Sequence, residues 1–394
     1  MAGLSVYIAP LLVFGLVVFV HELGHFLAAK LTGVYAPVFS LGWGRRIWGI
    51  RRGETDYRLS LIPLGGYVRM ASRDDESLAG IEGAADRGSF EASAQRPPNV
   101  PEALWDPNAM APFGPKPVPA NRWSESKSAS ARVFILSAGV LMNILLTFTV
   151  NTGISLQLGR NYTPAVVDSV VTDAPAARAG LQSGDRITAI NGEPVAAWND
   201  VVDRISAVTS GVVRVSVARG DSVITREIAP QVTDGIDRVT GATKKVGRIG
   251  VSVRDSVVHE ALAPLAAVRE GWQGTRRMAD NVFTVLTGLF KGEVSAKNLG
   301  GPIAIAKTSV QAARGGADML WALIAFLSIN IAILNMVPIP VLDGGQILMV
   351  VAERIKGSEF SMRTREAFAR VGVLAVLALI VLVTFNDVRS FFTR

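Results

Sequence analysis

Four long stretches of the chain carry no charged residue, and they restrict its possible folds more than any other feature. They are Leu4–Val20, Val133–Leu158, Met319–Leu342 and Val371–Phe385. A helix needs about 20 apolar residues to cross the hydrocarbon core of a bilayer. The middle two runs are long enough, the first is if its helix continues to Ala29, and the last is short without its flanks. The sequence therefore predicts a multi-pass α-helical membrane protein with about four transmembrane helices.

Basic residues gather in two of the loops between these runs. They are Arg45, Arg46, Arg51, Arg52, Arg58, Arg69 and Arg73 after the first run, and Lys356, Arg363, Arg365 and Arg370 before the last. By the positive-inside rule we expect both loops in the cytoplasm, which places residues 160–318 outside. The net charge of +7 comes without a basic stripe interleaved with aromatics, so no nucleic-acid partner is predicted. The chain has no cysteine, which excludes disulfides.

The first apolar run leads directly into His21-Glu22-Leu23-Gly24-His25. Residues four apart share a helix face, so the two imidazoles can reach one ion and supply half of a Zn²⁺ site. Glu22 is rotated by about 100° from His21, where a general base that takes a proton from water belongs. A short HExxH pattern can arise by chance, but two imidazoles and a carboxylate beside a bilayer are costly unless they function.

A catalytic zinc needs a third protein ligand, and two residues are candidates. His259 is the other histidine, but the predicted topology puts it outside, so we interpret it as an ordinary surface residue. Asp343 follows the third run at the cytoplasmic end, level with the HELGH motif, and is the preferred ligand. Pro338 and Pro340 predict unwound backbone just before it. Asn143, in the second run, either bonds a neighbouring helix or faces the site.

Two segments on the predicted cytoplasmic side have different characters. Residues 34–72 contain two extended-looking stretches, Val38–Ile50 and Tyr57–Met70, which predict a membrane-associated β-hairpin covered by protein. An ordinary soluble hairpin is the alternative. Residues 73–130 are rich in proline and predict a linker with little regular structure.

Two further segments follow the second run on the predicted outer side. Residues 163–232 contain Ala179-Gly180-Leu181-Gln182-Ser183-Gly184-Asp185-Arg186-Ile187-Thr188-Ala189-Ile190-Asn191-Gly192, a string that closely resembles a PDZ domain attached to bacterial proteases. An α+β PDZ domain binds extended peptide ends by adding a strand. Residues 233–315 are predicted as its tail and an amphipathic helix lying on membrane lipid.

Several motifs together resemble one family. They are the HELGH helix, IPLGGYV at Ile62–Val68, the PDZ string, GGPI at Gly300–Ile303 and NxxPxPxLDG at Asn335–Gly344. This combination is similar to the site-2 proteases, bacterial intramembrane zinc metalloproteases that cleave anti-sigma factors. One departure lies in the second run, where Val140 replaces the proline of the family's Gly-Pro-x-x-Asn pattern.

The resemblance implies hydrolysis of a peptide bond within the transmembrane segment of a single-span substrate such as an anti-sigma factor. Zn²⁺ would be held by His21, His25 and Asp343, with Glu22 as the catalytic base. Asn335 and Asn143 would hold the substrate backbone or the developing oxyanion. The location would be a bacterial inner membrane, with the active site near the cytoplasmic side and the PDZ domain outside.

The predicted order of segments can be stated in full. It is 1–33, first transmembrane helix with the zinc motif; 34–72, hairpin; 73–130, linker; 131–160, second transmembrane helix; 163–232, PDZ domain; 233–315, tail and amphipathic helix; 317–345, third transmembrane helix with the third ligand; 370–388, fourth transmembrane helix. A membrane zinc carrier and a PDZ scaffold with a structural metal are the alternative functions. A carrier has no need of a general base, and a structural zinc wants four protein ligands.

Overall fold

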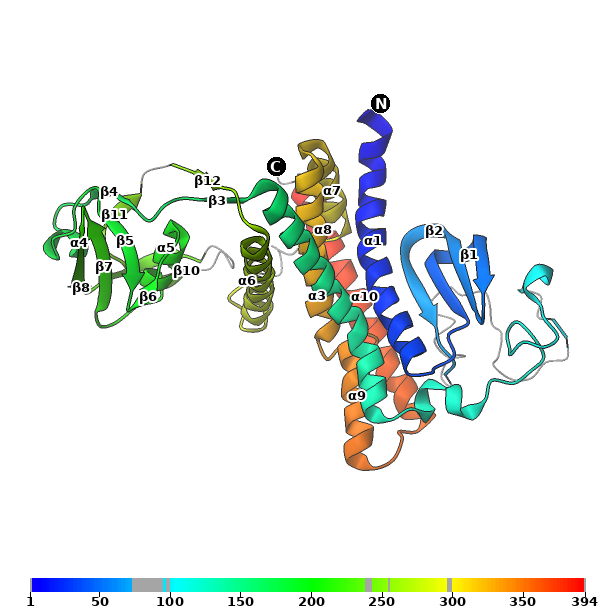
Figure 1. Ribbon diagram of the computed structural model, residues 1–394. Coiled ribbons are helices and arrows are strands. Elements are labelled where there is room, and N and C mark those ends of the chain that lie inside the picture. Colours follow the sequence, from blue (N-terminus) through cyan, green and yellow to red (C-terminus); the bar gives the residue numbers. More distant parts are fainter. Residues whose placement is uncertain are drawn as a thin grey trace. The chain divides into compact units, whose positions relative to one another are not determined.

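The computed structural model describes residues 2–72, 95–96, 100–237, 243–253, 256–295 and 300–392. The chain divides into two compact units (Figure 1). The first, which we call the helical unit, comprises Met1–Thr152, Gly271–Phe283 and Ala296–Arg394. The second comprises Gly153–Glu270 and Thr284–Ser295.

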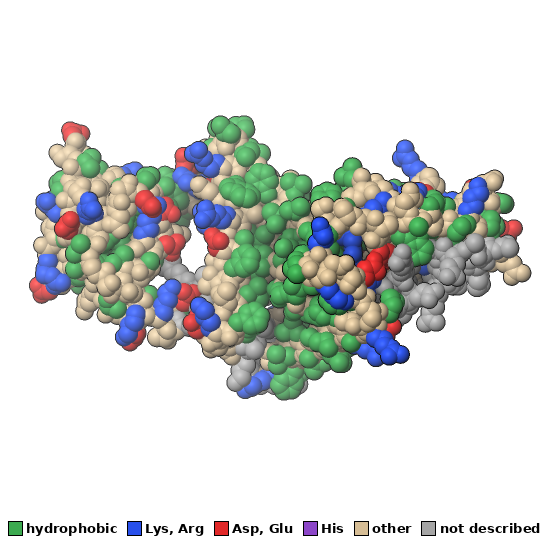
Figure 2. All heavy atoms as spheres, turned by 90° about the horizontal axis from the view of Figure 1, so that it is seen from below, with side chains coloured by type: hydrophobic (Ala, Val, Ile, Leu, Met, Phe, Trp, Pro, Cys, Tyr) green, Lys and Arg blue, Asp and Glu red, His purple; other side chains and the backbone are tan. Residues whose placement is uncertain are grey.

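The helical unit contains four helices that are long and apolar enough to cross a membrane. They are α1 (Ala2–Leu31), α3 (Ala129–Leu158), α8 (Ala317–Met336) and α10 (Met362–Phe392), and they include the four predicted runs. Large apolar side chains such as Leu12, Leu141, Phe326 and Leu374 are exposed on them. Figure 2 shows hydrophobic side chains gathered in the middle of the face seen from below. Such an uncovered apolar surface suits contact with lipid.

The third predicted span differs from the structure at its end. Helix α8 stops at Met336, and a new helix, α9 (Asp343–Lys356), begins seven residues later. Pro338 and Pro340 lack backbone N–H groups and cannot extend α8, and Val341 adopts a positive φ of 85°. Residues 317–345 are therefore a helix, an unwound turn and the first residues of a second helix. The fourth helix, α10, extends beyond the predicted 370–388 at both ends.

Helix α7 (Pro302–Gly315) packs against α1 and α8 in the helical unit. Its start is fixed by Asp387 near the end of α10, whose carboxylate accepts hydrogen bonds from the backbone N–H groups of Gly301, Ile303 and Ala304 at 2.9–3.0 Å. A carboxylate satisfies the unpaired N–H groups at a helix start and opposes the positive end of its dipole. A Cβ at Gly301 would stand 2.8 Å from Asp387 Oδ2, which explains the glycine of the GGPI motif.

The predicted hairpin folds as two long strands, β1 (Val38–Arg52) and β2 (Thr55–Arg69), against the end of α1. Both strands bend, so that residues 38–41 pair on one side with 56–59 and on the other with 66–69. The result is a small four-stranded arrangement in which residues 66–69 form an edge. Phe39 anchors it, with its ring centroid 5.0 Å from that of Phe26 on α1.

Residues 100–128 are more ordered than the predicted linker. They contain three short 3-10 helices, η1 (Glu102–Leu104), η2 (Ala120–Arg122) and η3 (Ser124–Ser126). Val100, Leu104 and Phe113 are buried in one apolar cluster with Val38 and Tyr67 of the hairpin. This segment therefore covers a face of the hairpin. Residues 73–94 and 97–99 of the predicted linker lie outside the described residues.

The second unit is built on a four-stranded sheet of order β6-β5-β7-β8. These strands are β5 (Arg186–Ile190), β6 (Glu193–Pro194), β7 (Val213–Arg219) and β8 (Ser222–Ile228). Helices α4 (Pro175–Arg178) and α5 (Trp198–Ser206) complete the string-bearing part. Val213, Val215 and Val217, at alternate positions of β7, are fully buried in its core.

The core of the second unit continues beyond residue 232, into the segment predicted as the tail of the PDZ domain. A hairpin of β9 (Gln231–Ile236) and β10 (Thr243–Arg248) leads to β11 (Val251–Val253). Strand β11 pairs with β4 (Val167–Val170), and Ile249 is buried in the same core as β7. Beyond it, β12 (Val258–Glu260) pairs with β3 (Arg160–Tyr162). The chain thus enters and leaves this domain through one two-stranded ribbon.

The predicted single amphipathic helix in 233–315 is two helices, α6 and α7. Helix α6 (Pro264–Phe290) carries exposed apolar side chains, including Trp272 and Phe283. Its middle crosses α3, where Asn151 Nδ2 donates to Thr275 Oγ1 at 3.1 Å. The crossing is close because Gly271 leaves no room for a side chain beside Thr152.

Candidate metal centre

Helix α1 places the two histidines of the HELGH motif on one face. His21 and His25 are one turn apart and are 5% and 7% exposed. Their ring centroids lie 4.7 Å apart with the planes at 83°, so the two Nε2 atoms converge at 3.1 Å. The preceding run has no charge that could pair with them, so the partner must come from another element.

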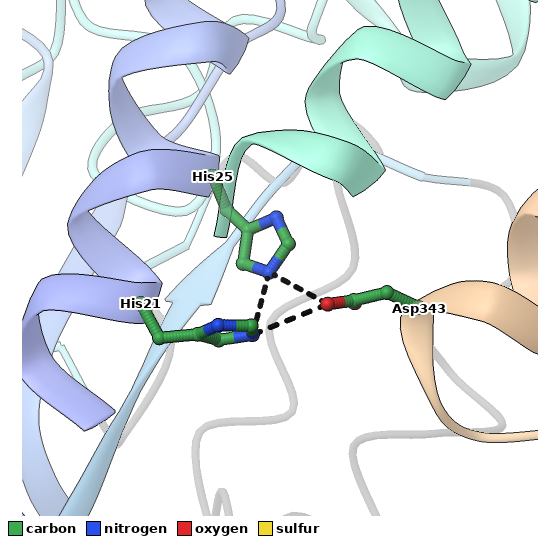
Figure 3. A group of neighbouring side chains, drawn as sticks. All are labelled: His21, His25 and Asp343. Atoms are coloured by element: carbon green, nitrogen blue, oxygen red, sulfur yellow. Dashed lines mark hydrogen bonds and ion pairs between the residues drawn. The ribbon is translucent and has the colours of Figure 1, made fainter. Parts of the chain in front are cut away.

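The partner is Asp343, the first residue of α9, which faces the two imidazoles (Figure 3). The turn after α8 brings it there, and the two glycines that follow make that turn possible. A Cβ at Gly344 would collide with the carbonyl of Met336, and one at Gly345 with the carbonyl of Ile339. The DGG sequence thus lets α9 start directly beneath the end of α8.

The three side chains have the spacing of a zinc site. Asp343 Oδ2 lies 3.2 Å from His21 Nε2 and 3.5 Å from His25 Nε2. Tetrahedral zinc with ligand bonds of about 2.0–2.1 Å separates its ligand atoms by about 3.3–3.4 Å, close to these distances. Asp343 Oδ2 is also buried without a hydrogen-bond partner among the described residues, as expected of an atom that binds a metal. The residues therefore fit the ion, and among the described residues they form the group that could hold one.

Helix α3 lies against the two imidazoles of the cluster. The carbonyl of Ile135 accepts a hydrogen bond from His25 Nδ1 at 2.8 Å, which leaves Nε2 to face the cluster. A Cβ at Gly139 would stand 2.5 Å from His25 Nε2 and 2.6 Å from His21 Cε1, so only glycine leaves the site open. Asn143 is fully buried, with Nδ2 3.4 Å from His21 Nδ1.

Glu22 lies beside the cluster and not within it. The group of possible metal ligands consists of His21, His25 and Asp343. Glu22 faces the hairpin edge, where a Cβ at Gly66 would be 3.6 Å from Glu22 Cγ. A carboxylate next to a metal but off its ligand set is the arrangement that a general base requires.

The predicted site residues come together except for the rejected candidate. Asn335, at the end of α8, has its Nδ2 3.0 Å from His21 Nε2. His259 is exposed on β12 in the second unit, where its Nδ1 lies 3.0 Å from Asn161 Oδ1. Ile135 and Gly139 were not predicted as site residues. Their spacing of four from each other and from Asn143 is the signal that marks a common helix face.

Comparisons with known proteins point to one family. The sequence profile of Peptidase family M50 matches residues 9–379. The chain is similar to a putative zinc metalloprotease of Clostridium perfringens, at 29% identity over 97% of this chain and 98% of the relative. It is similar to the regulator of sigma-W protease RasP of Bacillus subtilis, at 29% identity over 98% of both. A putative zinc metalloprotease of Agrobacterium fabrum is 33% identical over 98% of this chain and 97% of the relative.

Two solved structures match a smaller part. The PDZ domain of an SdrC-like protein from Listeria monocytogenes is 28% identical and covers 24% of this chain and 90% of its own, with a TM-score of 0.19. Its counterpart from Listeria innocua is 27% identical and covers 25% of this chain and 99% of its own, also with a TM-score of 0.19.

Proposed function

Since the chain belongs to peptidase family M50, the site-2 proteases, and is a zinc metalloprotease of intramembrane proteolysis, we propose that it cleaves within the transmembrane segment of a single-span, anti-sigma-factor-like substrate. The observation that carries the proposal is the convergence of His21, His25 and Asp343 at tetrahedral spacing, inside a unit of apolar helices. The family match covers residues 9–379 and is to a peptidase family, so it supports neither of the alternative functions, the membrane zinc carrier and the PDZ scaffold.

Each side chain of the site has a proposed part in the reaction. His21, His25 and Asp343 hold the zinc, which when bound acts as a Lewis acid on the scissile carbonyl and makes water more acidic. Glu22 takes the proton from the attacking water and gives it to the leaving nitrogen as the peptide C–N bond breaks. Asn335, on the opposite side of His21 from Asn143, donates from its amide to the substrate carbonyl or to the oxyanion that develops there.

The substrate must present extended backbone, because a helix hides its peptide bonds in its own hydrogen bonds. The edge segment 66–69 of the hairpin supports this step. Among the described residues it pairs with residues 38–41 on one side only, and Gly66 within it is adjacent to Glu22. A substrate segment added to this edge as a further strand would run past the general base and the metal ligands.

The second unit supplies the proposed substrate selection. The chain enters and leaves the PDZ domain of this unit through the β3–β12 ribbon. We place this domain outside the membrane on the charge pattern of the loops, where it reads peptide C-termini or excludes untrimmed substrates. The Bacillus subtilis relative is named a regulator of sigma-W protease, which supports an anti-sigma factor as the substrate class.

The experiment that tests the proposal is direct. Purified protein in detergent or liposomes is mixed with single-span test substrates whose transmembrane segments differ in sequence. We expect cleavage inside the segment, loss of cleavage with a zinc chelator and recovery when zinc is restored. Cleavage that maps only to residues outside the membrane segment, or that resists the chelator, would contradict the proposal.

A further inference from the structure

One face of α3 runs along the whole metal centre. Ile135, Gly139 and Asn143 follow one another at intervals of four, so their positions align on the helix. The first bonds the outer nitrogen of His25, the second leaves the space for the ligand atoms, and the third lies against the outer nitrogen of His21. The face therefore contacts both imidazoles on the nitrogen that points away from Asp343.

The outer nitrogen of each imidazole, Nδ1, needs a hydrogen-bond acceptor when the ring binds zinc. A neutral ring that binds zinc through Nε2 carries its hydrogen on Nδ1, and that hydrogen needs an acceptor. The carbonyl of Ile135 is such an acceptor for His25. The group beside His21 Nδ1 is the amide of Asn143, with its NH₂ end at 3.4 Å. An NH₂ group is a donor, so it suits the tautomer of His21 that has its hydrogen on Nε2 and cannot bind zinc there.

The oxygen of the same Asn143 amide is buried in a way that polar atoms seldom are. Asn143 Oδ1 is buried and has no hydrogen-bond partner among the described residues. Rotation of the amide by 180° exchanges its two ends, so either orientation leaves one amide atom without a described partner. The imidazole then decides between them, because only the oxygen can accept a hydrogen from Nδ1.

We propose that Asn143 is a positioning residue whose Oδ1 accepts a hydrogen bond from His21 Nδ1–H when His21 binds zinc. The inference rests on the proposed ligand set and gives Asn143 a different task from oxyanion binding. It fixes both the tautomer and the ring orientation of His21, as the Ile135 carbonyl does for His25. The two ligands on α1 are thus both oriented by α3.

The backbone around Asn143 is held tightly enough for this task. Its carbonyl accepts hydrogen bonds from Thr147 Oγ1 at 3.0 Å and from Ser328 Oγ on α8 at 2.9 Å. Thr147 also bonds the carbonyl of Ala325 at 3.1 Å. Asn143, Thr147 and Ser328 are all fully buried, so water cannot take over these bonds. The backbone that carries the Asn143 side chain is therefore held between α3 and α8, next to His21.

Zinc affinity of the full-length protein in detergent, measured by competition with a chelator, tests the proposal. Asn143→Ala should weaken zinc binding by about 10–100-fold, the usual effect of losing a group that orients a ligand. Asn143→Asp keeps an acceptor but cannot donate, so it should restore most of the affinity. Asn151→Ala is the matched control, since Asn151 lies on the same helix and bonds another helix through Thr275. It should leave zinc affinity unchanged.

A second readout needs no variant. In zinc-loaded protein with ¹⁵N-labelled histidine, the Nδ1 of His21 should carry the proton, which nuclear magnetic resonance detects directly. An unprotonated Nδ1, unchanged zinc affinity in Asn143→Ala, or Asn143→Asp as weak as Asn143→Ala would overturn the proposal. Wild-type protein that binds no zinc would instead refute the proposed function, so the two failures are distinguishable.

Discussion

The two units of the chain both bury carboxylates, but they satisfy them differently. In the second unit, Asp185 is 1% exposed, and its oxygens accept two hydrogen bonds from Arg219 at 2.7 and 2.8 Å and one from the backbone of Gln182 at 2.9 Å. In the helical unit, Asp343 Oδ2 is buried and has no hydrogen bond among the described residues. It faces the Nε2 atoms of His21 and His25 at 3.2 and 3.5 Å. A buried carboxylate oxygen without a hydrogen-bond donor is costly, so it persists where something else binds it. We therefore interpret Asp185 as a carboxylate that stabilises the fold and Asp343 as one that binds a ligand.

The largest effect should come from Glu22, which lies next to the cluster of His21, His25 and Asp343. Glu22→Gln keeps the shape of the side chain and removes its basicity, so turnover should fall by about 10²–10⁴-fold. Zinc content should stay near wild type because Glu22 is not among the clustered ligands. Metal analysis beside a cleavage assay checks both points, and loss of zinc in this variant would show that Glu22 is a ligand.

A substitution that fills the site should affect the metal more than the fold. Gly139→Ala places a Cβ against His21 and His25, so zinc affinity should fall by at least about 100-fold. Gly153→Ala, later in α3, meets nothing within 4 Å and serves as the control. Alanine favours a helix over glycine by about 1 kcal/mol, so neither variant should weaken α3 itself. Equal zinc affinity in the two variants would contradict the geometry of the centre.

Removing the PDZ domain of the second unit should leave the chemistry intact. The β3–β12 ribbon pairs Tyr162 with Val258, so residues 163–257 can be replaced by a short glycine linker. The variant should bind zinc like wild type and cleave pre-trimmed substrates within a few-fold of it, while also accepting untrimmed ones. A folded, zinc-loaded variant that cleaves nothing would show that the PDZ domain takes part in catalysis.

The smallest effect should come from Asp185, the hydrogen-bonded carboxylate, and should concern the stability of the second unit. The Arg219 guanidinium bonded to Asp185 holds the pKa of that carboxyl below its usual range. A lowered pKa gives stability that is full above about pH 4, the pKa of an unfolded Asp, and is lost as pH falls through the folded value. Asp185→Asn should remove this dependence and lower the urea midpoint of the second unit by about 1 M at pH 7. Hydrogen exchange of the backbone amides in β5 and β7 measures the stability of this unit. Zinc binding should be unchanged in this variant.

Much of this arrangement could be predicted because its signals are local. The apolar runs predicted the four helices, and the HELGH spacing with the NxxPxPxLDG motif predicted a zinc metalloprotease, which the family match confirms. The part of the linker at 100–128 could not be predicted from composition, since its order comes from packing on the hairpin. The part of the tail that joins the core of the second unit could not be predicted for a similar reason, because β11 does so by pairing with the distant β4.

The contacts made by α3 and α10 depend on long-range geometry. The four-residue spacing puts Gly139 on the same helix face as Asn143, but it does not say that this face meets two imidazoles. Likewise, nothing near Asp387 says that it binds the start of α7. Glycine and aspartate each have many other uses in membrane helices. Only the approach of helices distant in sequence assigns these roles.

The central claim is that zinc is held by His21, His25 and Asp343, and metal analysis of two purified variants tests it most directly. Asp343→Ala leaves two neutral imidazoles and removes the negative charge that offsets the dication, so zinc affinity should fall by more than about 100-fold. His259→Ala, in which the removed histidine is exposed in the second unit, should retain wild-type zinc. Full zinc and activity in Asp343→Ala, or loss of zinc in His259→Ala, would contradict the ligand set.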